Sequence, residues 1–408
     1  MKRNAIIGQS GGPTAAINAT LAGVIRGCLA SDKIDLVYGM KNGIEGLLEE
    51  RFVLLDQELC NEENLNLLEQ TPSAALGSCR VKLPEQKDLM ICENNIYIRI
   101  FDILSRYNIR YFFYIGGNDS MDTVHKLNDY AKKTGYDIRI IGIPKTIDND
   151  LALTDHTPGF GSAAKYVATT VREIIRDCAV YTMNTVNIIE IMGRNAGWLA
   201  AASAIGRVVD GIAPDLVYLA ECDFDINTFY NDIKKAFERR TNVVIAVSEG
   251  ISIHRDLLKN ADPEHLDAFG HGQLAGVGKI LEHAVKERFG CKVRSIELNV
   301  TQRSASHVLS LTDIEEAVSI GKKAVEVSQE GASGVMVAFK RNEGSSYSCD
   351  IVCVPVERVA NEIKKVPASF INAEQNNVTD ECCEYLLPLI CGEYPVIWEK
   401  GLPKQIIF

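Results

Sequence analysis

Short apolar runs recur along this chain, separated by polar turns and by stretches of small residues. Runs this short that are rich in β-branched side chains predict buried strands. We predict such strands at residues 5–7, 36–39, 111–115, 138–143, 186–191, 216–219, 243–247 and 333–339. Small-residue stretches predict helices at residues 15–26 and 199–205. Strands that alternate with helices predict an α/β fold with mainly parallel sheets.

The length of the chain allows two domains. Its 408 residues suffice for two units with cores of their own, at about 150 residues per domain. Strands and helices alternate in both halves, and this pattern predicts two similar layered domains.

Composition excludes several classes of protein. Hydrophobic residues make up 46% of the chain and charged residues 24%, which is typical of a globular protein. A formal net charge of -11 argues against general binding to nucleic acid. The apolar runs fall well short of the roughly 20 residues of a membrane-spanning helix, and the amino terminus does not resemble a signal peptide, so we expect a cytoplasmic protein. The twelve cysteines form no Cys-x-x-Cys pair, so we expect mostly free, buried thiols and no zinc site.

The polar segment at residues 144–150, Pro-Lys-Thr-Ile-Asp-Asn-Asp, directly follows a predicted strand. Ligands of open α/β sheets bind at the carboxyl ends of strands. Lys145 there is suited to hold a phosphate, and Thr146 can donate a hydrogen bond. Asp148 and Asp150 can divide proton abstraction and metal binding between them. The alternative is a polar turn that merely ends a strand.

A glycine-rich loop at residues 8–14 lies between the first predicted strand and the first predicted helix. Glycines such as Gly11 and Gly12 let the backbone approach an anion closely, and a helix start offers unpaired N–H groups. This arrangement predicts phosphate binding, although an ordinary tight turn has the same form. The loop lacks the Gly-Lys-Ser/Thr ending of a nucleotide P-loop.

A second glycine loop, at residues 116–121, follows the predicted strand 111–115. It can face the first loop across a crevice. Asn118 and Asp119 would supply the hard oxygen ligands that suit magnesium.

Further charged side chains follow other predicted strands and loops. Arg80 comes after a glycine-containing loop, Arg194 follows the strand 186–191, and Glu249 follows the strand 243–247. Arginines in such places can clamp phosphates or carboxylates. A second basic cluster comprises Arg294, Gln302 and Arg303.

Two segments look like nucleotide-binding motifs but do not fit them. Residues 157–164 match Gly-x-Gly-x-x-Ala, yet no strand is predicted directly before them. Residues 272–279 have one residue too many for a P-loop. We therefore assign no nucleotide site to either.

Taken together, the motifs resemble the 6-phosphofructokinase family, in the family's order and spacing, over about residues 5–340. The motifs that carry the resemblance are Gly11-Gly12, residues 116–120, 144–150 and 192–194, and Gln302-Arg303. The resemblance implies phosphoryl transfer to the 1-hydroxyl of fructose 6-phosphate, in a cleft between two Rossmann-like three-layer domains. Residues 1–155, joined by part of 300–408, would bind diphosphate, and residues 156–299 would bind the sugar phosphate. Residues 340–408 would be a carboxyl-terminal extension that packs on the core.

The resemblance also implies roles for individual residues. Asp148 would be the general base, with Lys145 and Asp119 as further catalytic residues. Diphosphate would be bound by Gly11, Gly12, Arg80, Gly117 and Lys145. The sugar phosphate or the moving phosphoryl group would be contacted by Thr146, Asp148, Met192, Gly193, Arg194, Glu249, Arg294, Gln302 and Arg303. One of the arginines Arg294 and Arg303 comes from a neighbouring subunit in relatives, so we expect a homodimer or homotetramer. Mg²⁺ would be the cofactor, held by Asn118 and Asp119.

Two residues concern the phosphoryl donor. ATP-using members carry glycine where this chain has Asp119 and Lys145. An aspartate at the first position would repel and obstruct the α-phosphate, and a lysine at the second fills space and adds a cation. The resemblance is therefore to the branch that uses inorganic diphosphate reversibly. Asn118 replaces an aspartate of many members, and Val300 replaces a histidine that binds substrate in ATP-using relatives.

Two alternatives stay open at this point. One is an ATP-dependent phosphofructokinase that tolerates Asp119 and Lys145. The other is a non-catalytic subunit that keeps the fold and senses sugar phosphates. In either case we expect small-molecule ligands, and no nucleic-acid or membrane partner.

Overall fold

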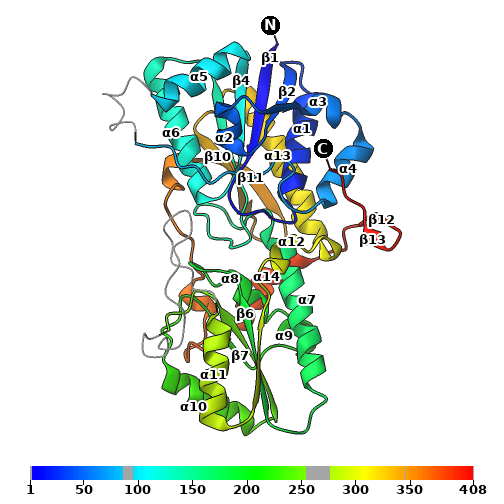
Figure 1. Ribbon diagram of the computed structural model, residues 1–408, viewed down its shortest axis with the longest axis vertical. Coiled ribbons are helices and arrows are strands. Elements are labelled where there is room, and N and C mark those ends of the chain that lie inside the picture. The colour runs from blue at the N-terminus through cyan, green and yellow to red at the C-terminus, as the bar shows by residue number, and fades with distance from the viewer. Residues whose placement is uncertain (1, 86–94, 254–275, 345, 408) are drawn as a thin grey trace.

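We describe the protein from a computed structural model, which describes residues 2–85, 95–253, 276–344 and 346–407. Two sheets organise the described part, one above the other in Figure 1. The larger sheet has the order β11-β10-β5-β4-β1-β2-β3, and the smaller one has the order β7-β8-β6-β9. The prediction of an α/β fold with two Rossmann-like domains is confirmed.

In the larger sheet the five central strands run parallel, and an antiparallel strand lies at each edge. The central strands are β1 (Arg3–Gln9), β2 (Ile34–Met40), β4 (Ile109–Gly116), β5 (Arg139–Pro144) and β10 (Val335–Arg341). The edge strands are β3 (Phe52–Leu54) and β11 (Cys349–Pro355). Because the central strands are parallel, the loops that follow β1, β4 and β5 all emerge at one end of the sheet.

Helices cover both faces of the larger sheet, because alternate residues of a strand point to opposite faces. On β1, Ala5 and Ile7 belong to one apolar cluster and Ile6 to another. The first cluster includes α1 (Ile17–Leu29), α3 (Leu55–Glu58), α4 (Glu62–Gln70) and α13 (Leu311–Gln329). The second includes α2 (Gly43–Leu48), α5 (Ile96–Arg106) and α6 (Asn118–Thr134). The result is a three-layer unit.

The smaller sheet is also the middle of three layers. Its parallel strands are β6 (Thr185–Ile191), β7 (Leu216–Tyr218), β8 (Asn242–Ser248) and β9 (Lys292–Glu297). One face packs against α7 (Phe160–Cys178), α8 (Trp198–Ala202) and α14 (Asp380–Leu386). The other face packs against α10 (Ile226–Phe237) and α11 (Val277–Phe289).

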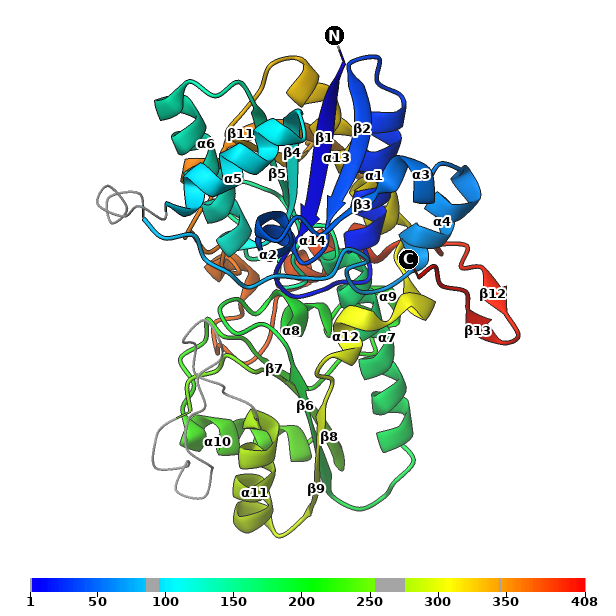
Figure 2. The same ribbon diagram turned by 45° about the horizontal axis from the view of Figure 1, so that its top comes forward.

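Short elements complete the described chain. They are α9 (Gly206–Asp210), α12 (Thr301–Ser304), η3 (Ser306–Val308), η4 (Val356–Arg358), η5 (Ala368–Phe370), η6 (Leu387–Ile390), β12 (Trp398–Glu399) and β13 (Leu402–Pro403). Figure 2 shows the hairpin of β12 and β13 beside α4, where the Gln70 side chain bonds the backbone of Ile397 and Lys404.

The carboxyl-terminal region differs in part from the expected extension. Within residues 340–408, strand β11 joins the larger sheet beside β10 instead of packing on its surface. Helix α14 then contributes Cys382, Cys383 and Leu386 to the core of the smaller sheet. The chain therefore returns from one sheet to the other after β11.

All eight predicted strands overlap observed ones, and both predicted helices overlap α1 and α8. The prediction missed the strands β3, β9, β11, β12 and β13 and several helices, among them α4 and α5. Eleven cysteines lie in the described part, all free, and six of them are buried. Among the described helices none is long and apolar enough to cross a membrane.

Candidate active site

A cleft of about 440 Å³ lies between the two sheets, a size suited to a small-molecule ligand. Its walls are loops that directly follow β1, β4 and β5 on one side and β6 and β8 on the other. The lining residues that sequence analysis had selected are Gly11, Gly12, Arg80, Gly117, Asn118, Asp119, Lys145, Thr146, Asp148, Asp150, Met192, Arg194 and Glu249. The structure thus brings together residues from six separate segments.

Lys145 joins three of these loops. Its ammonium donates a hydrogen bond to the Gly12 carbonyl at 2.6 Å, and its amide donates to the Gly116 carbonyl at 3.0 Å. The residue is only 2% exposed. Burial lowers the pKa of Lys145 to about 8, although the carboxylates of Asp148 and Asp150 act in the opposite direction. A cation is therefore fixed beneath the glycine loop that follows β1.

Glycine is required at one point of that loop. Gly11 has a φ of 78°, a left-handed conformation that side chains disfavour. A Cβ atom there would lie 3.1 Å from the Lys145 ammonium nitrogen. The backbone can therefore approach both the lysine and a ligand.

Asp148 and Asp150 form a half-buried pair of carboxyl groups. The Asp148 amide donates to the Thr146 hydroxyl at 3.1 Å, and Asn149 between the two aspartates is left-handed, with a φ of 53°. Burial raises the pKa of Asp148, and the carboxylates of Asp150 and Glu249 raise it further. Burial raises the pKa of Asp150 too. Two like charges this close resist joint ionisation, so the pair suits proton transfer near neutral pH.

On the opposite wall the loop after β6 is held by hydrogen bonds to its backbone. The Gly193 amide donates to the Glu249 carboxylate at 3.3 Å, and the Ser248 hydroxyl donates to the Gly193 carbonyl at 2.7 Å. The Met192 amide donates to the side-chain oxygen of Gln302 at 3.3 Å. Burial raises the pKa of Glu249. This wall is thus a fixed frame with one carboxylate facing the cleft.

Arginines and lysines concentrate positive charge in the cleft. A Cβ atom on Gly12 would lie 3.3 Å from a guanidinium nitrogen of Arg303, so this arginine reaches the glycine loop. Burial lowers the pKa of Arg303, and the nearby Arg80 adds to the effect. Lys82 pairs with Asp119 at 2.9 Å, on the same side of the cleft. Arg80, Lys145 and Arg303 thus lie close together beside the glycine loop that follows β1, and such a cluster of cations favours an anionic ligand there.

Comparison with known proteins identifies the family, because residues 4–328 match the family described as Phosphofructokinase. The chain belongs to the phosphofructokinase family.

Similar proteins extend this result over almost the whole chain. A protein of Halomonas elongata named pyrophosphate–fructose 6-phosphate 1-phosphotransferase is 41% identical, over 99% of this chain and 95% of its own length. A protein of Alkalicoccus urumqiensis named sulfofructose kinase is 33% identical, over 94% of this chain and 95% of its own length. The crystal structure of a pyrophosphate-dependent phosphofructokinase from Nitrosospira multiformis has a TM-score of 0.88 and 35% identity, and covers 100% of this chain and 96% of its own.

Two residues selected from the phosphofructokinase resemblance make other contacts than expected. Arg294 is exposed on β9, opposite Asn187, and lines a small separate cavity with residues such as Asp177. It does not reach the cleft of its own chain, because it precedes the carboxyl end of the sheet. The expectation that a neighbouring subunit supplies an arginine stays a prediction.

Asn118 is the second. It borders the cleft, but its amide oxygen accepts from the Asn361 amide at 2.5 Å and its amide nitrogen donates to the Glu362 carbonyl at 2.6 Å. Both polar atoms are therefore engaged in holding the chain after η4. The assignment of Asn118 as a metal ligand stays a prediction, while Asp119 is the stronger oxygen ligand of that pair.

The structure also shows why the first of the two nucleotide-like segments is no nucleotide site. Residues 157–164 lead into α7, whose first N–H groups are occupied: Asp313 accepts from the Gly159 amide at 2.8 Å and from the Ser162 amide at 2.9 Å. An internal carboxylate thus takes the place that a phosphate would need. Residues 272–275 of the other segment lie outside the described residues.

Sequence reasoning missed several residues of the cleft in this phosphofructokinase. Lys82 could have been found from its place two residues after Arg80. Asn361 and Ile363 line the cleft as well, yet no motif marks them. They come from the segment after η4, whose position depends on the tertiary fold.

Proposed function

We propose that this protein transfers a phosphoryl group reversibly from inorganic diphosphate to the 1-hydroxyl of fructose 6-phosphate. The products are fructose 1,6-bisphosphate and phosphate. The observation that carries the proposal is the buried Lys145 cation beneath the Gly11 and Gly12 loop, in the same cleft as Asp119. The names of the relatives from Halomonas and Nitrosospira support it.

The wall built on the larger sheet would bind the donor. Diphosphate is short and highly charged, and Lys145, Arg80 and the amides of the glycine loop offer it closely spaced donors. Asp119 lies in the first turn of α6 and borders the same space. Its carboxylate would repel the additional phosphate of a nucleotide, and Lys145 occupies volume that a nucleotide would need.

The wall built on the smaller sheet would bind the sugar phosphate. Glu249 would accept hydrogen bonds from sugar hydroxyls, beside Met192 and Gly193. Arg194 and Thr146 would contact the moving phosphoryl group or the sugar phosphate, and Gln302 keeps the loop after β6 in place. Arg303 would hold the 6-phosphate from α12.

Asp148 would act as the general base. As the new bond to phosphorus forms, its carboxylate takes the proton of the 1-hydroxyl, and the bond to the leaving phosphate breaks. Lys145 and Arg194 neutralise charge on the phosphoryl oxygens. Most of the rate would come from this positioning and charge neutralisation, because phosphoryl transfer leaves little covalent work to the protein.

The residues present also fit a divalent metal, for which we propose Mg²⁺. Carboxylates of Asp119, Asp148 and Asp150 line the cleft, and hard oxygen ligands are those that Mg²⁺ prefers. When bound, the ion would neutralise charge on the diphosphate. Asp119 is the proposed protein ligand, with further oxygens from the diphosphate.

The test is turnover of fructose 6-phosphate with Mg²⁺ and either diphosphate or ATP at equal concentration, with the product coupled to aldolase. We expect diphosphate to be preferred by at least about 100-fold, because two residues act against the nucleotide. Preference for ATP would refute the donor assignment, and turnover with neither donor would favour a sugar-phosphate sensor. A parallel assay with sulfofructose in place of fructose 6-phosphate tests the acceptor, since one relative is named sulfofructose kinase.

We also propose a homodimer or homotetramer in which Arg294 of one chain completes the cleft of the next. Its exposure away from its own cleft supports this arrangement. Light scattering gives the mass, and Arg294→Ala should then raise the KM for fructose 6-phosphate without changing that mass.

A further inference from the structure

Residues 361–366 lie beyond the segment that matches the family, and they run along the border of the cleft. Next to the Asn118 contacts, Ile363 forms an isolated bridge with Leu151. The Lys364 amide then donates to the Asp150 carbonyl at 2.8 Å. This segment therefore holds the loop that follows β5 and also contacts the second glycine loop through Asn118.

The segment continues to the smaller sheet. The Val366 amide donates to the Glu221 carboxylate at 2.8 Å, and the same carboxylate accepts from the Gly197 amide at 3.0 and 3.1 Å. The Trp198 indole donates to the Lys364 carbonyl at 3.1 Å. A single stretch of chain thus contacts both walls of the cleft.

The side chain of Lys364 ends on the loop that carries the proposed base. Its ammonium donates to the Asn149 side-chain oxygen at 2.9 Å, to the Thr154 carbonyl at 3.1 Å and to the Asp155 carbonyl at 2.7 Å. These three acceptors use all three N–H groups of the ammonium. The ring of Trp198 lies 5.2 Å from the nitrogen, within the range of a cation–π contact.

Asn149 is the residue on which this contact acts. It is fully buried, left-handed, and lies between Asp148 and Asp150. A residue other than glycine keeps that conformation only where its surroundings hold it. Since neighbouring backbone torsions set the direction of a side chain, the bond from Lys364 fixes the direction of Asp148.

We propose that Lys364 is a positioning residue for phosphoryl transfer, which holds Asn149 and so aims the Asp148 carboxylate at the sugar hydroxyl. The inference rests on the proposed function. It adds a determinant of catalysis from a part of the chain that carries none of the motifs.

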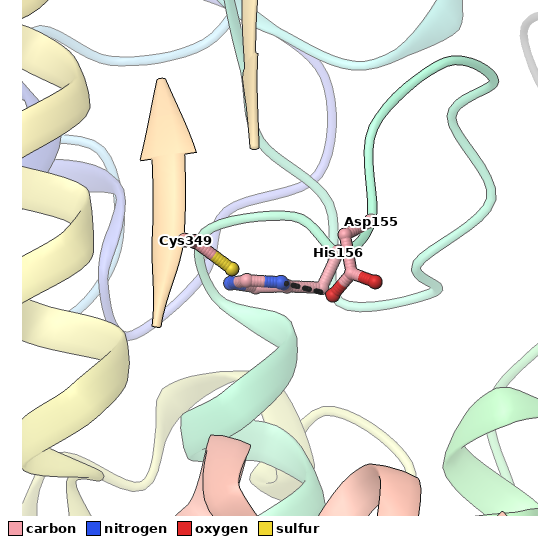
Figure 3. A group of neighbouring side chains, drawn as sticks. All are labelled: Asp155, His156 and Cys349. Atoms are coloured by element: carbon pink, nitrogen blue, oxygen red, sulfur yellow. Dashed lines mark hydrogen bonds and ion pairs between the residues drawn. The ribbon is translucent and has the colours of Figure 1, made fainter. Parts of the chain in front are cut away.

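Asp155, whose carbonyl accepts a hydrogen bond from Lys364, belongs to a network of charged side chains. Figure 3 shows Asp155, His156 and Cys349 close together. The ring of His156 bonds Asp155 at 2.9 Å through Nδ1 and Glu316 at 2.7 Å through Nε2. Burial opposes a charge on this ring, but the two carboxylates outweigh it and raise the pKa of His156.

This network is better explained as a support than as a metal site. A metal needs a lone pair of a ring nitrogen, and both nitrogens of His156 are already bonded to carboxylates. Arg341 contacts the Asp155 carboxylate as well, at 3.1 Å. Asp155 is thus held from several sides, and its carbonyl is a fixed acceptor for Lys364.

The test compares Lys364→Met with Lys165→Met in the full-length protein. Lys165 is a matched control, because its buried ammonium also bonds two backbone carbonyls, those of Leu309 and Gly392, but away from the cleft. We expect Lys364→Met to lower kcat by about 10- to 100-fold, with the KM of both substrates changed by less than about 3-fold. The control should keep kcat within about 2-fold of the parent.

A double-mutant cycle with Asn149→Gly guards against a merely structural effect. Glycine accepts the left-handed conformation but removes the acceptor of Lys364. If the two residues act through one contact, the combined variant loses about as much kcat as the more impaired single variant. Effects that multiply would refute the proposal, as would an unchanged kcat in Lys364→Met or an equal loss in the control.

If Lys364→Met does not fold, Asn149→Gly alone must still lower kcat at constant KM, and an unchanged kcat overturns the idea. A parent protein without turnover on diphosphate would instead refute the proposed function. The two failures can therefore be told apart.

Discussion

The two walls of the cleft are built differently. The wall on the larger sheet contains Lys145, a cation only 2% exposed, and beside it the half-buried Asp148, whose pKa is raised by burial. The wall on the smaller sheet is a frame of backbone hydrogen bonds, in which Glu249 accepts from Gly193. Dry, fixed charges suit the transfer of a phosphoryl group and a proton, and a rigid polar frame suits recognition of a sugar.

The difference has a structural origin. The loop after β5 is bonded to the glycine loops through Lys145 and to the carboxyl-terminal segment through Asp150. The loop after β6 is bonded mainly to its neighbours at the same sheet end, such as Ser248. If the wall on the larger sheet serves the chemistry and the wall on the smaller sheet serves sugar binding, substitutions on the former should change kcat and those on the latter should change KM.

The largest effect should come from Asp148→Ser. Without the carboxylate the 1-hydroxyl keeps its proton, so we expect kcat to fall by about 10³-fold or more. Calorimetry should show binding of fructose 6-phosphate within a few-fold of the parent. Asp137→Asn, at an exposed position before β5, is the control and should keep full activity. A sensor protein would show no such contrast.

A smaller effect, specific to the choice of phosphoryl donor, is expected when Asp119 and Lys145 are both replaced by glycine. In Asp119→Gly with Lys145→Gly, a repelling carboxylate and a bulky cation are both removed. We expect kcat/KM for diphosphate to fall by about 100-fold while turnover with ATP becomes measurable. Steady-state kinetics with both donors measures the ratio. A ratio that stays unchanged would show that other residues choose the donor.

On the second wall, Glu249→Gln removes a charge but keeps an oxygen that can accept from Gly193. We expect the KM for fructose 6-phosphate to rise by about 10-fold, with kcat within about 3-fold of the parent. The comparison breaks down if kcat falls instead, because Glu249 would then take part in the chemistry.

The smallest expected effect is a displacement of the pH profile. The base works only when ionised, and its pKa is raised, so kcat should fall as the pH drops through a range above that of an ordinary aspartate. Asp150→Asn removes a neighbouring negative charge, which lowers the pKa of Asp148. The acid limb of kcat should then move to lower pH by about one unit. Thermal unfolding over the same pH range separates this displacement from loss of fold.

Much of the fold could be predicted from the sequence, because buried central strands are short apolar runs. The missed strands β3, β9 and β11 are only partly buried; β3 has just three residues, and among the six residues of β9 only Val293 and Ile296 are apolar. Residues 351–354 of β11 do form an apolar run, which the prediction did not use. Helix α4 escaped notice because its polar composition hides the buried Leu65 and Leu68. Short length conceals β3, and polar composition conceals β9 and α4.

By itself the sequence determined the chemistry offered at each strand end. The glycine loops, the segment at residues 144–150, and the pair Asp119 and Lys145 follow buried strands directly, and parallel strands bring their ends to one place. Only the tertiary structure decided which side chains reach the cleft. It placed Arg294 outside its own cleft, engaged Asn118 with the backbone, and brought Lys364 to Asn149 from 215 positions away. Such contacts depend on how the chain returns between the sheets, which no local pattern encodes.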